Sequence, residues 1–294
     1  MFALPKKPKK PSHGAAAVIT GAGSGIGAAF AMELASRRGR VVCSDIDDTA
    51  AQATVDGIVD NGGEAVAMPC DVSRIDDVRE LAARSETWFR GPPTLVINNA
   101  GVGAGGAPIG EIPLADWSWT LGINLWGPIH GCHVFAPILR DAEYGGIINV
   151  ASAASFGAAP TMAAYNVSKA GVLSLSETLA AELSGTGVRV TVLCPTFVKT
   201  NIVESGRISA ETTALADKLM RWTGYSASRV ARTCLDTHDR GGLYCMPQLE
   251  ARIGWGIKRF TPSAYTRAVG LVSRISATRN TASHGALSHD AVSH

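Results

Sequence analysis

The feature that most limits how this chain can fold is a glycine-rich turn between an apolar segment and a helical one. Residues 15–20 read Ala-Ala-Ala-Val-Ile-Thr, residues 21–27 read Gly-Ala-Gly-Ser-Gly-Ile-Gly, and a helical pattern then runs to about Arg38. Glycines permit a tight turn and a close approach of the backbone to a pyrophosphate, whose charge faces the positive end of the following helix. The order strand, glycine turn, helix therefore predicts a phosphate-binding site, although the spacing departs from the common Gly-x-Gly-x-x-Gly pattern.

The same alternation of strand and helix continues along the chain. Apolar segments that predict six more strands occur at residues 40–45, 64–69, 94–97, 146–151, 188–193 and 242–246. Helical patterns between them occur at residues 48–61, 74–90, 116–139 and 161–183. Strands separated by helices of this length favour a parallel sheet. We therefore expect one α/β domain over residues 14–250, a doubly wound seven-stranded parallel sheet with helices on both faces.

The two ends of the chain differ from this pattern. Residues 1–13 are rich in proline and lysine, which predicts a disordered, solvated basic tail and argues against a cleaved secretion signal. Residues 251–275 interleave basic with apolar side chains, as in a basic amphipathic segment. We expect this extension to cover the substrate pocket or a neighbouring subunit, a reading favoured over contact with a membrane surface. Residues 276–294 are rich in serine, alanine and histidine and are expected to be disordered.

Composition narrows the possible partners. A net formal charge of +2 is too small to indicate a nucleic-acid partner. The six cysteines, Cys43, Cys70, Cys132, Cys194, Cys234 and Cys245, show no metal-ligand spacing. We therefore expect reduced, buried thiols, no metal and a cytoplasmic location.

Three residues around the 146–151 strand predict a proton-transfer site. Tyr165 and Lys169 are four apart, so on a helix they share a face. A nearby ammonium favours the phenolate, which would lower the tyrosine pKa from about 10 toward neutrality. Ser152 follows the strand and could hydrogen-bond a substrate oxygen as charge develops on it. A Tyr-x-x-x-Lys pair alone is more often part of an ordinary amphipathic helix, so the interpretation depends on the other motifs.

Polar residues at the predicted carboxyl ends of the strands indicate a nucleotide groove. Asp45 ends the second strand 24 residues after Gly21, where its carboxylate could accept both ribose hydroxyls of an adenosine and repel a 2′-phosphate. Ile46 follows it and Ala22 occupies the glycine turn, so no cation stands where it would neutralise that phosphate. The pattern favours NAD over NADP. Asn124 lies inside a predicted apolar helix, where a buried amide needs hydrogen-bond partners.

Together these motifs resemble the short-chain dehydrogenase/reductase family over roughly residues 14–250. The matching residues are Thr20-Gly21-x-x-x-Gly25-Ile26-Gly27, Asn98-Asn99-Ala100-Gly101, Asn124, Ser152, Tyr165-x-x-x-Lys169 and Pro195 through Thr200. Two features depart from the family's usual pattern: Thr196 stands where glycine is common, and the chain continues for almost fifty residues beyond Met246.

The resemblance implies a Rossmann-like subunit and a set of residue roles. Tyr165 would be the acid/base, Ser152 would position the substrate oxygen, and Lys169 would bind the nicotinamide ribose and lower the tyrosine pKa. Asn124 would hold a water in the proton relay. The implied cofactor-binding residues are Gly21, Ser24, Gly25, Ile26, Gly27, Asp45, Ile46, Asp71, Val72, Asn98, Ala100, Gly101, Tyr165, Lys169, Pro195, Val198 and Thr200, with Val198 and Thr200 at the carboxamide. A homodimer or homotetramer is also implied.

The leading hypothesis for function is an NAD-dependent dehydrogenase or carbonyl reductase that acts on a lipophilic secondary alcohol or ketone, with the cofactor carrying the hydride. One alternative is an NADPH-dependent ketone or 3-oxoacyl reductase. Another is a catalytically silent nucleotide-sensing protein, which the intact Ser152, Tyr165 and Lys169 disfavour.

Overall fold

A computed structural model describes residues 10–199, 206–208 and 225–274 of the chain. Seven parallel strands form the central sheet in the order β11-β7-β6-β4-β1-β2-β3. They are β1 (Ala16–Thr20), β2 (Arg40–Asp45), β3 (Glu64–Pro69), β4 (Leu95–Asn98), β6 (Gly145–Val150), β7 (Val188–Leu193) and β11 (Tyr244–Cys245). The predicted seven-stranded parallel sheet is confirmed.

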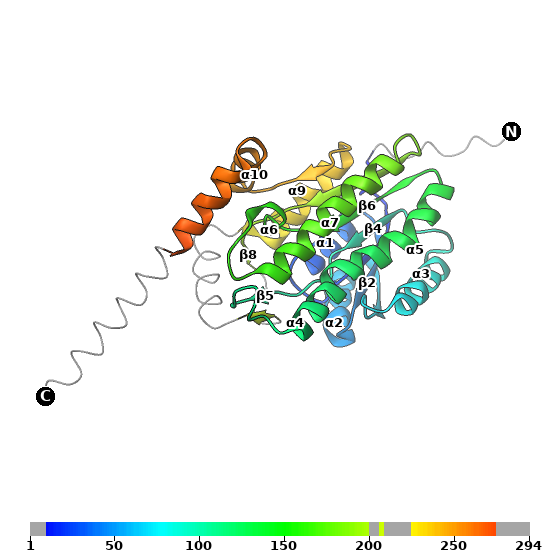
Figure 1. Ribbon diagram of the computed structural model, residues 1–294. Helices are drawn as coiled ribbons and strands as arrows, with labels where there is room; N and C mark the ends of the chain where they lie inside the picture. Colours follow the sequence, from blue (N-terminus) through cyan, green and yellow to red (C-terminus); the bar gives the residue numbers. More distant parts are fainter. Residues whose placement is uncertain (1–9, 200–205, 209–224, 275–294) are drawn as a thin grey trace, which may run out of the picture.

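Helices cover both faces of this sheet, as the sequence predicts (Figure 1). The longer ones are α1 (Gly25–Ser36), α2 (Asp48–Asp60), α3 (Ile75–Phe89), α5 (Gly127–Asp141), α7 (Ala163–Glu182) and α9 (Ala227–Asp239). Helices α1, α2 and α9 bury Phe30, Ile58 and Leu235 in one core against the sheet. Helices α3, α5 and α7 bury Leu81 and Phe135, among others, in a second core on the opposite face.

The sheet reverses its strand order between β1 and β4. Strand β1 pairs with β2 on one side and with β4 on the other. The chain that follows β1 therefore continues toward one edge of the sheet, and the chain that follows β4 continues toward the opposite edge. In open parallel sheets, ligands bind at such a reversal, beyond the carboxyl ends of the strands. The fold therefore places its binding crevice beside the glycine turn after β1 and the Asn-Asn-Ala-Gly segment after β4.

The single helix expected at residues 116–139 is three helical segments. Helix α4 (Leu114–Leu121) passes into a π-helical turn, η1 (Gly122–Trp126), and then into α5. Pro128 has no N–H to donate to the carbonyl of Asn124 four residues earlier, which interrupts the regular α-helical bonding. Within this turn, the side chain of Asn124 bonds the Val102 backbone.

The ends of the chain are partly described. Residues 1–9 and 275–294, which include most of the predicted tails, lie outside the described residues. Ser12, which the prediction places in the disordered basic tail, is buried in the structure. Its N–H and its hydroxyl donate to Asp239 at 2.9 and 2.8 Å, so the ordered part of the chain begins before residue 13. Two further helices follow β11, namely α10 (Leu249–Phe260) and residues 262–274. No helix in the described part of the chain is long and apolar enough to span a bilayer.

A buried histidine on α9 makes the stability of the fold depend on pH. His238 is fully buried, with its Nδ1 2.9 Å from the hydroxyl oxygen of Thr191. That hydroxyl donates to the Gly242 carbonyl at 2.8 Å, so Nδ1 carries the proton and donates to Thr191. A Cβ at Gly146 would lie 2.1 Å from Nε2, so β6 leaves no space for a further group there.

We expect burial of His238 to lower the free energy of unfolding at acidic pH. Burial lowers the pKa of His238 from 6.5 to about 4. As the pH falls, the unfolded chain protonates this histidine at about pH 6.5, but the folded chain protonates it only at about pH 4. The free energy of unfolding should therefore fall by about 3 kcal/mol between these two pH values. Urea unfolding of the wild type and of His238→Gln, which cannot titrate, tests this as a difference between pH 7 and pH 4. Equal acid sensitivity of the two proteins would contradict it.

Candidate active site

Ser152, Tyr165 and Lys169 meet at the carboxyl end of β6. Ser152 lies two residues beyond the end of the strand, and Tyr165 and Lys169 occupy the first turns of α7. The Ser152 hydroxyl lies close enough to the Tyr165 phenol to act on its pKa, and its oxygen accepts from the Ala154 N–H at 3.1 Å. The Nζ of Lys169 lies 5.8 Å from the centroid of the Tyr165 ring and donates to the Val150 carbonyl at 3.0 Å. The structure thus brings the three predicted catalytic side chains together.

The pKa of the tyrosine shifts in the direction opposite to the expected one. Burial raises the pKa of Tyr165 above 10, and the nearby Ser152 hydroxyl offsets only part of that rise. Burial also lowers the pKa of Lys169 to about 8. Both shifts arise because a poorly solvated site disfavours the charged form of each side chain. At neutral pH the tyrosine is therefore a neutral phenol, a form that can donate a proton to a developing alkoxide.

Asn124 lies beside this trio but its amide is engaged by the backbone. Its Oδ1 accepts from the Val102 N–H at 2.7 Å and its Nδ2 donates to the Val102 carbonyl at 2.8 Å. A Cβ at Gly101 would lie 3.1 Å from that Oδ1 and 3.3 Å from the Lys169 Nζ. Glycine at this position lets the segment after β4 pass between the two side chains. Asn124 fixes that segment in place, and its predicted role in holding a water stays a prediction.

The glycine turn between β1 and α1 is shaped for close contact. Gly21 and Gly25 have φ angles of +66° and +56°, in the left-handed region that favours glycine. A Cβ at Gly27 would lie 2.0 Å from the Gly21 carbonyl oxygen and 2.5 Å from Asn99 Nδ2, so a side chain there would disrupt the turn. Ser24 caps α1 without a side-chain hydrogen bond. The first turn of α1 contains no acidic residue, so its N–H groups can face an anionic ligand.

Asp45 connects the end of β2 to the glycine turn. Its Oδ2 accepts from the Gly23 N–H at 2.9 Å, and its Oδ1 accepts from the Asp47 N–H at 3.1 Å. Ile46 beside it is 74% exposed. Asp45 forms no ion pair with a described residue, so its carboxylate at the rim of the turn presents negative charge to any ligand that lies across the turn.

The remaining predicted cofactor residues lie at several places. Those at the carboxyl edge of the sheet are Asp71, Val72, Ala100, Gly101 and Pro195, together with Ser24 and Ile26 at the start of α1. Val198 lies in β8 (Val198–Lys199), which pairs with β10 (Tyr225–Ser226). Thr200 lies outside the described residues. The side chain of Asn98 points into the core and donates to Asn149 Oδ1 at 2.8 Å, so its predicted contact with a cofactor would have to come from its backbone and stays a prediction.

Asn99 and Asn149 are two supporting residues that sequence reasoning did not place in the site. Asn99 donates from Nδ2 to the carbonyls of Thr20 and Gly21 at 2.9 and 3.0 Å, and so braces the glycine turn against the segment after β4. Asn149 joins Asn98 to Ser176 in a buried network. The signal for Asn149 was a polar side chain within the apolar run that leads to Ser152, since a buried amide requires partners.

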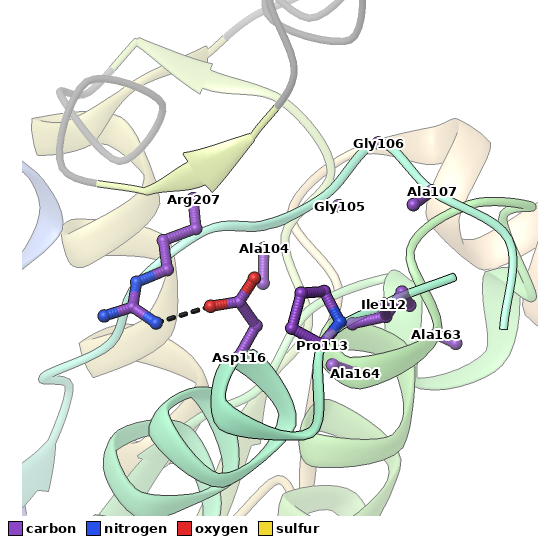
Figure 2. A pocket seen from close by; sticks show the side chains of 10 residues that line it. All are labelled: Ala104, Gly105, Gly106, Ala107, Ile112, Pro113, Asp116, Ala163, Ala164 and Arg207. Carbon is purple, nitrogen blue, oxygen red and sulfur yellow. Dashed lines mark hydrogen bonds and ion pairs between the residues drawn. The ribbon is translucent and has the colours of Figure 1, made fainter. Parts of the chain in front are cut away.

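A pocket of about 230 Å³ lies at the start of α7, beside Ala163 and Ala164, the two residues that precede Tyr165 (Figure 2). It is lined by Ala104, Gly105, Gly106, Ala107, Ile112, Pro113, Asp116, Ala163, Ala164 and Arg207. Most of this lining is small and apolar. The two charged side chains, Asp116 of α4 and Arg207 of β9 (Arg207–Ile208), form an ion pair with each other. The pocket therefore suits an uncharged, apolar ligand.

Comparison with known proteins agrees with this geometry. Residues 15–211 match the protein family described as short chain dehydrogenase. The chain belongs to this family. A solved structure of a short chain dehydrogenase/reductase from Burkholderia phymatum in complex with NAD has a TM-score of 0.78 and 34% identity, covering 85% of this chain and 94% of that one.

Two curated members of the short-chain dehydrogenase family show how far the likeness extends. A probable oxidoreductase, EphD, from Mycobacterium tuberculosis is 33% identical over 84% of this chain but only 43% of its own length. This chain thus spans less than half of that relative. A D-threitol dehydrogenase from Mycolicibacterium smegmatis is 38% identical over 64% of this chain and 72% of its own length.

Thr196, which stands after Pro195 where the family usually has glycine, makes two hydrogen bonds to the C-terminal part of the chain. The hydroxyl of Thr196 donates to Glu250 of α10 at 2.9 Å, and its N–H donates to Gln248 at 3.2 Å. Thr196 is not among the residues with positive φ, so a side chain is tolerated. The substitution ties the loop after β7 to the C-terminal extension.

Proposed function

We propose that the chain is an NAD-dependent oxidoreductase that interconverts a lipophilic secondary alcohol and its ketone. The observation that carries this proposal is the meeting of Tyr165, Ser152 and Lys169 at the carboxyl end of β6, with the Lys169 Nζ 5.8 Å from the centroid of the tyrosine ring. Two neighbouring hydroxyls can hold a carbonyl oxygen, and the phenol can deliver a proton to it. A bound nicotinamide would supply or accept the hydride.

Each of the three side chains has its own part in this scheme. The phenol of Tyr165, kept neutral by burial, gives its proton to the oxygen in reduction and takes it back in oxidation. Ser152 donates a hydrogen bond that orients that oxygen. Lys169 would bind the nicotinamide ribose and return protons to the tyrosine. Burial brings the pKa of this lysine to about 8, so it can exchange protons near neutral pH.

The preference for NAD is supported by Asp45. Its carboxylate lies against the Gly23 N–H, where it could accept the hydroxyls of an adenosine ribose and would repel a 2′-phosphate. An NADPH-dependent ketone or 3-oxoacyl reductase is the competing proposal, and it requires a cation near this carboxylate. A nucleotide-sensing protein without turnover would have no need of the Tyr165–Ser152 pair, which weighs against that alternative.

The lipophilic substrate is supported by the pocket that precedes Tyr165 on α7. Its lining of alanine, glycine, proline and isoleucine offers no unpaired charge to a polar substrate. None of the residues lining it, in the part of the chain that the structure describes, belongs to the C-terminal extension. The expectation that the extension covers the substrate pocket therefore gains no support from this pocket.

We also propose a homodimer or homotetramer in a reducing, cytoplasmic environment. Trp126 of η1 and Val167 of α7 are 53% and 48% exposed, which leaves apolar surface on helices that follow β4 and β6. All six cysteines are buried and free. Light scattering at micromolar concentration tests the assembly, and a monomer would count against it.

A panel of alcohols with both cofactors tests the proposed function. Cyclic, steroid, terpenoid and long-chain secondary alcohols, with D-threitol as the polar comparison, are mixed with the protein and NAD or NADP, and reduced nicotinamide is followed by absorbance. We expect turnover of a lipophilic secondary alcohol, faster with NAD. Turnover only with NADP would favour the reductase alternative. Tight NAD binding without turnover of any alcohol or ketone would favour the sensor.

The Asp116–Arg207 pair should affect substrate binding more than chemistry. The Arg207 guanidinium bonds Asp116 and lies 4.3 Å from the centroid of the Trp119 ring, while the Arg207 N–H donates to the Gly103 carbonyl at 3.0 Å. These contacts hold β9 against β5 (Ala104–Gly105) at the pocket. We expect Arg207→Ala to raise KM about threefold to tenfold with less than a twofold change in kcat, a modest effect because the pair is partly exposed.

A matched control separates this effect from loss of a surface arginine. Arg232 is also exposed and paired, with Glu33 on α1, and lies away from the pocket. Arg232→Ala should leave KM unchanged. Equal effects of the two substitutions, or a fall in kcat alone for Arg207→Ala, would refute a positioning role for Arg207.

A further inference from the structure

Helix α10 carries two apolar faces, and only one of them packs against other residues that the structure describes. On the packed face, Ala251 is buried and the Trp255 ring lies 5.5 Å from the ring of Tyr244. The second face consists of residues spaced by four, four and three, which align along a helix. We call this second face the C-terminal stripe; its residues and exposed fractions are Leu249 65%, Ile253 53%, Ile257 49% and Phe260 85%.

The C-terminal stripe is held in a fixed orientation. Glu250 accepts from the Thr196 hydroxyl at 2.9 Å, and Arg252 donates to the Met246 carbonyl at 2.8 Å. In the following helix, the Tyr265 hydroxyl donates to the Gly157 carbonyl at 3.4 Å. Figure 1 shows α10 and residues 262–274, in orange, at one end of the molecule and outside the layers that sandwich the sheet. A surface helix ordinarily turns its one apolar stripe to the core, so the outward stripe requires a partner.

The charges around the stripe indicate the chemistry of that partner. Residues 249–274 contain five basic side chains, Arg252, Lys258, Arg259, Arg267 and Arg274, against the single acidic Glu250. The whole chain has a net charge of only +2, so positive charge is concentrated here. A second copy docked by the same face would bring like charges together, which is unfavourable. Anionic lipid headgroups would instead attract the basic side chains while the acyl boundary accepts the apolar ones.

We propose that α10 docks the protein on the surface of an anionic lipid bilayer. The C-terminal stripe enters the boundary between headgroups and acyl chains, and the exposed Arg259 and Arg267 contact the headgroups. The helix lies along the surface and does not span it, since its twelve residues extend about 18 Å. Helix α10 also packs against α6 (Ala154–Gly157), the turn that follows Ser152. This inference goes beyond the proposed reaction and does not depend on it.

Sedimentation of the full chain with vesicles tests this proposal. Vesicles of phosphatidylcholine alone are compared with vesicles that also contain phosphatidylserine. We expect the wild type to bind the anionic vesicles at least tenfold more tightly, and Ile253→Ser/Ile257→Ser/Phe260→Ser to lose at least tenfold of that affinity. Each of Arg259→Gln and Arg267→Gln should weaken binding about fivefold.

Matched controls use surface positions away from α10. Val59 on α2 is 53% exposed, and Arg79 on α3 is exposed, so Val59→Ser and Arg79→Gln should leave vesicle binding unchanged. Two outcomes would overturn the proposal. One is equal or absent binding of the wild type to both kinds of vesicle. The other is an oligomer that the triple serine substitution dissociates, with no effect on vesicle binding, which would assign the stripe to a second copy of the chain. Light scattering of both proteins distinguishes these results from misfolding.

Discussion

Replacing Tyr165 by phenylalanine should lower kcat/KM for alcohol oxidation and ketone reduction by about 10²- to 10⁴-fold, the range that general acid–base groups contribute. The substitution removes one oxygen, the atom that lies near the Ser152 hydroxyl, and leaves the ring in place. Proton transfer then has no donor within the site. The loss should appear in kcat, because the nucleotide turn and the substrate pocket are untouched.

The control for this substitution is another tyrosine hydroxyl with a defined partner. Tyr244 donates to Glu177 at 2.7 Å on the outside of α7. Tyr244→Phe removes the same atom from a structural hydrogen bond, and we expect it to retain activity within about twofold, since an exposed side-chain hydrogen bond contributes about 1 kcal/mol to stability and nothing to the reaction. Cofactor binding to both variants is measured by fluorescence. Retention of more than a tenth of wild-type kcat/KM by Tyr165→Phe would remove this residue from the proton-transfer step.

Substituting asparagine for Asp45 should shift the preference between the two nicotinamide cofactors by about 10²-fold, because hydrogen bonds to charged groups contribute about 1.5 to 3 kcal/mol and the repulsion of a phosphate adds to them. The asparagine Oδ1 can still accept from the Gly23 N–H, now at 2.9 Å from Asp45, so the turn keeps its shape. The ratio of kcat/KM for NAD to that for NADP is the measured quantity. It should fall mainly through the KM of each cofactor.

Asp60 provides the matched loss of one negative charge. It ends α2, is exposed, and lies at the far end of that helix from the crevice. Asp60→Asn should leave the cofactor ratio unchanged. A wild type that already prefers NADP, or an Asp45→Asn ratio equal to that of the wild type, would show that this carboxylate does not select the cofactor.

Features that depend on local pattern were predictable from the sequence. Strand β7 begins and ends at the predicted residues, Val188 and Leu193, because a segment rich in β-branched residues that follows turn residues can be recognised locally. Ser152, Tyr165 and Lys169 meet as expected, since a strand end and a four-residue spacing on a helix place them together. The parallel order of the sheet follows from the alternation of strands and helices.

Features that depend on distant partners were not predictable in the same way. The helix at 116–139 is interrupted where Asn124 bonds Val102, a contact that no local pattern encodes. The Asn98 side chain faces the core because Asn149 of the neighbouring strand is its partner. The pKa of Tyr165 rises because burial outweighs its neighbours, and burial is known only once the chain is folded.

The measurement that tests the central claim most directly is the fate of the hydrogen on the alcohol carbon. An alcohol that the wild type oxidises is prepared with deuterium at that carbon and incubated with NAD, and the reduced cofactor is analysed by mass spectrometry. We expect one deuterium per reduced nicotinamide with the wild type, and transfer slowed about 10²- to 10⁴-fold in Tyr165→Phe. Reduced cofactor without deuterium, or transfer at the wild-type rate in Tyr165→Phe, would contradict the account.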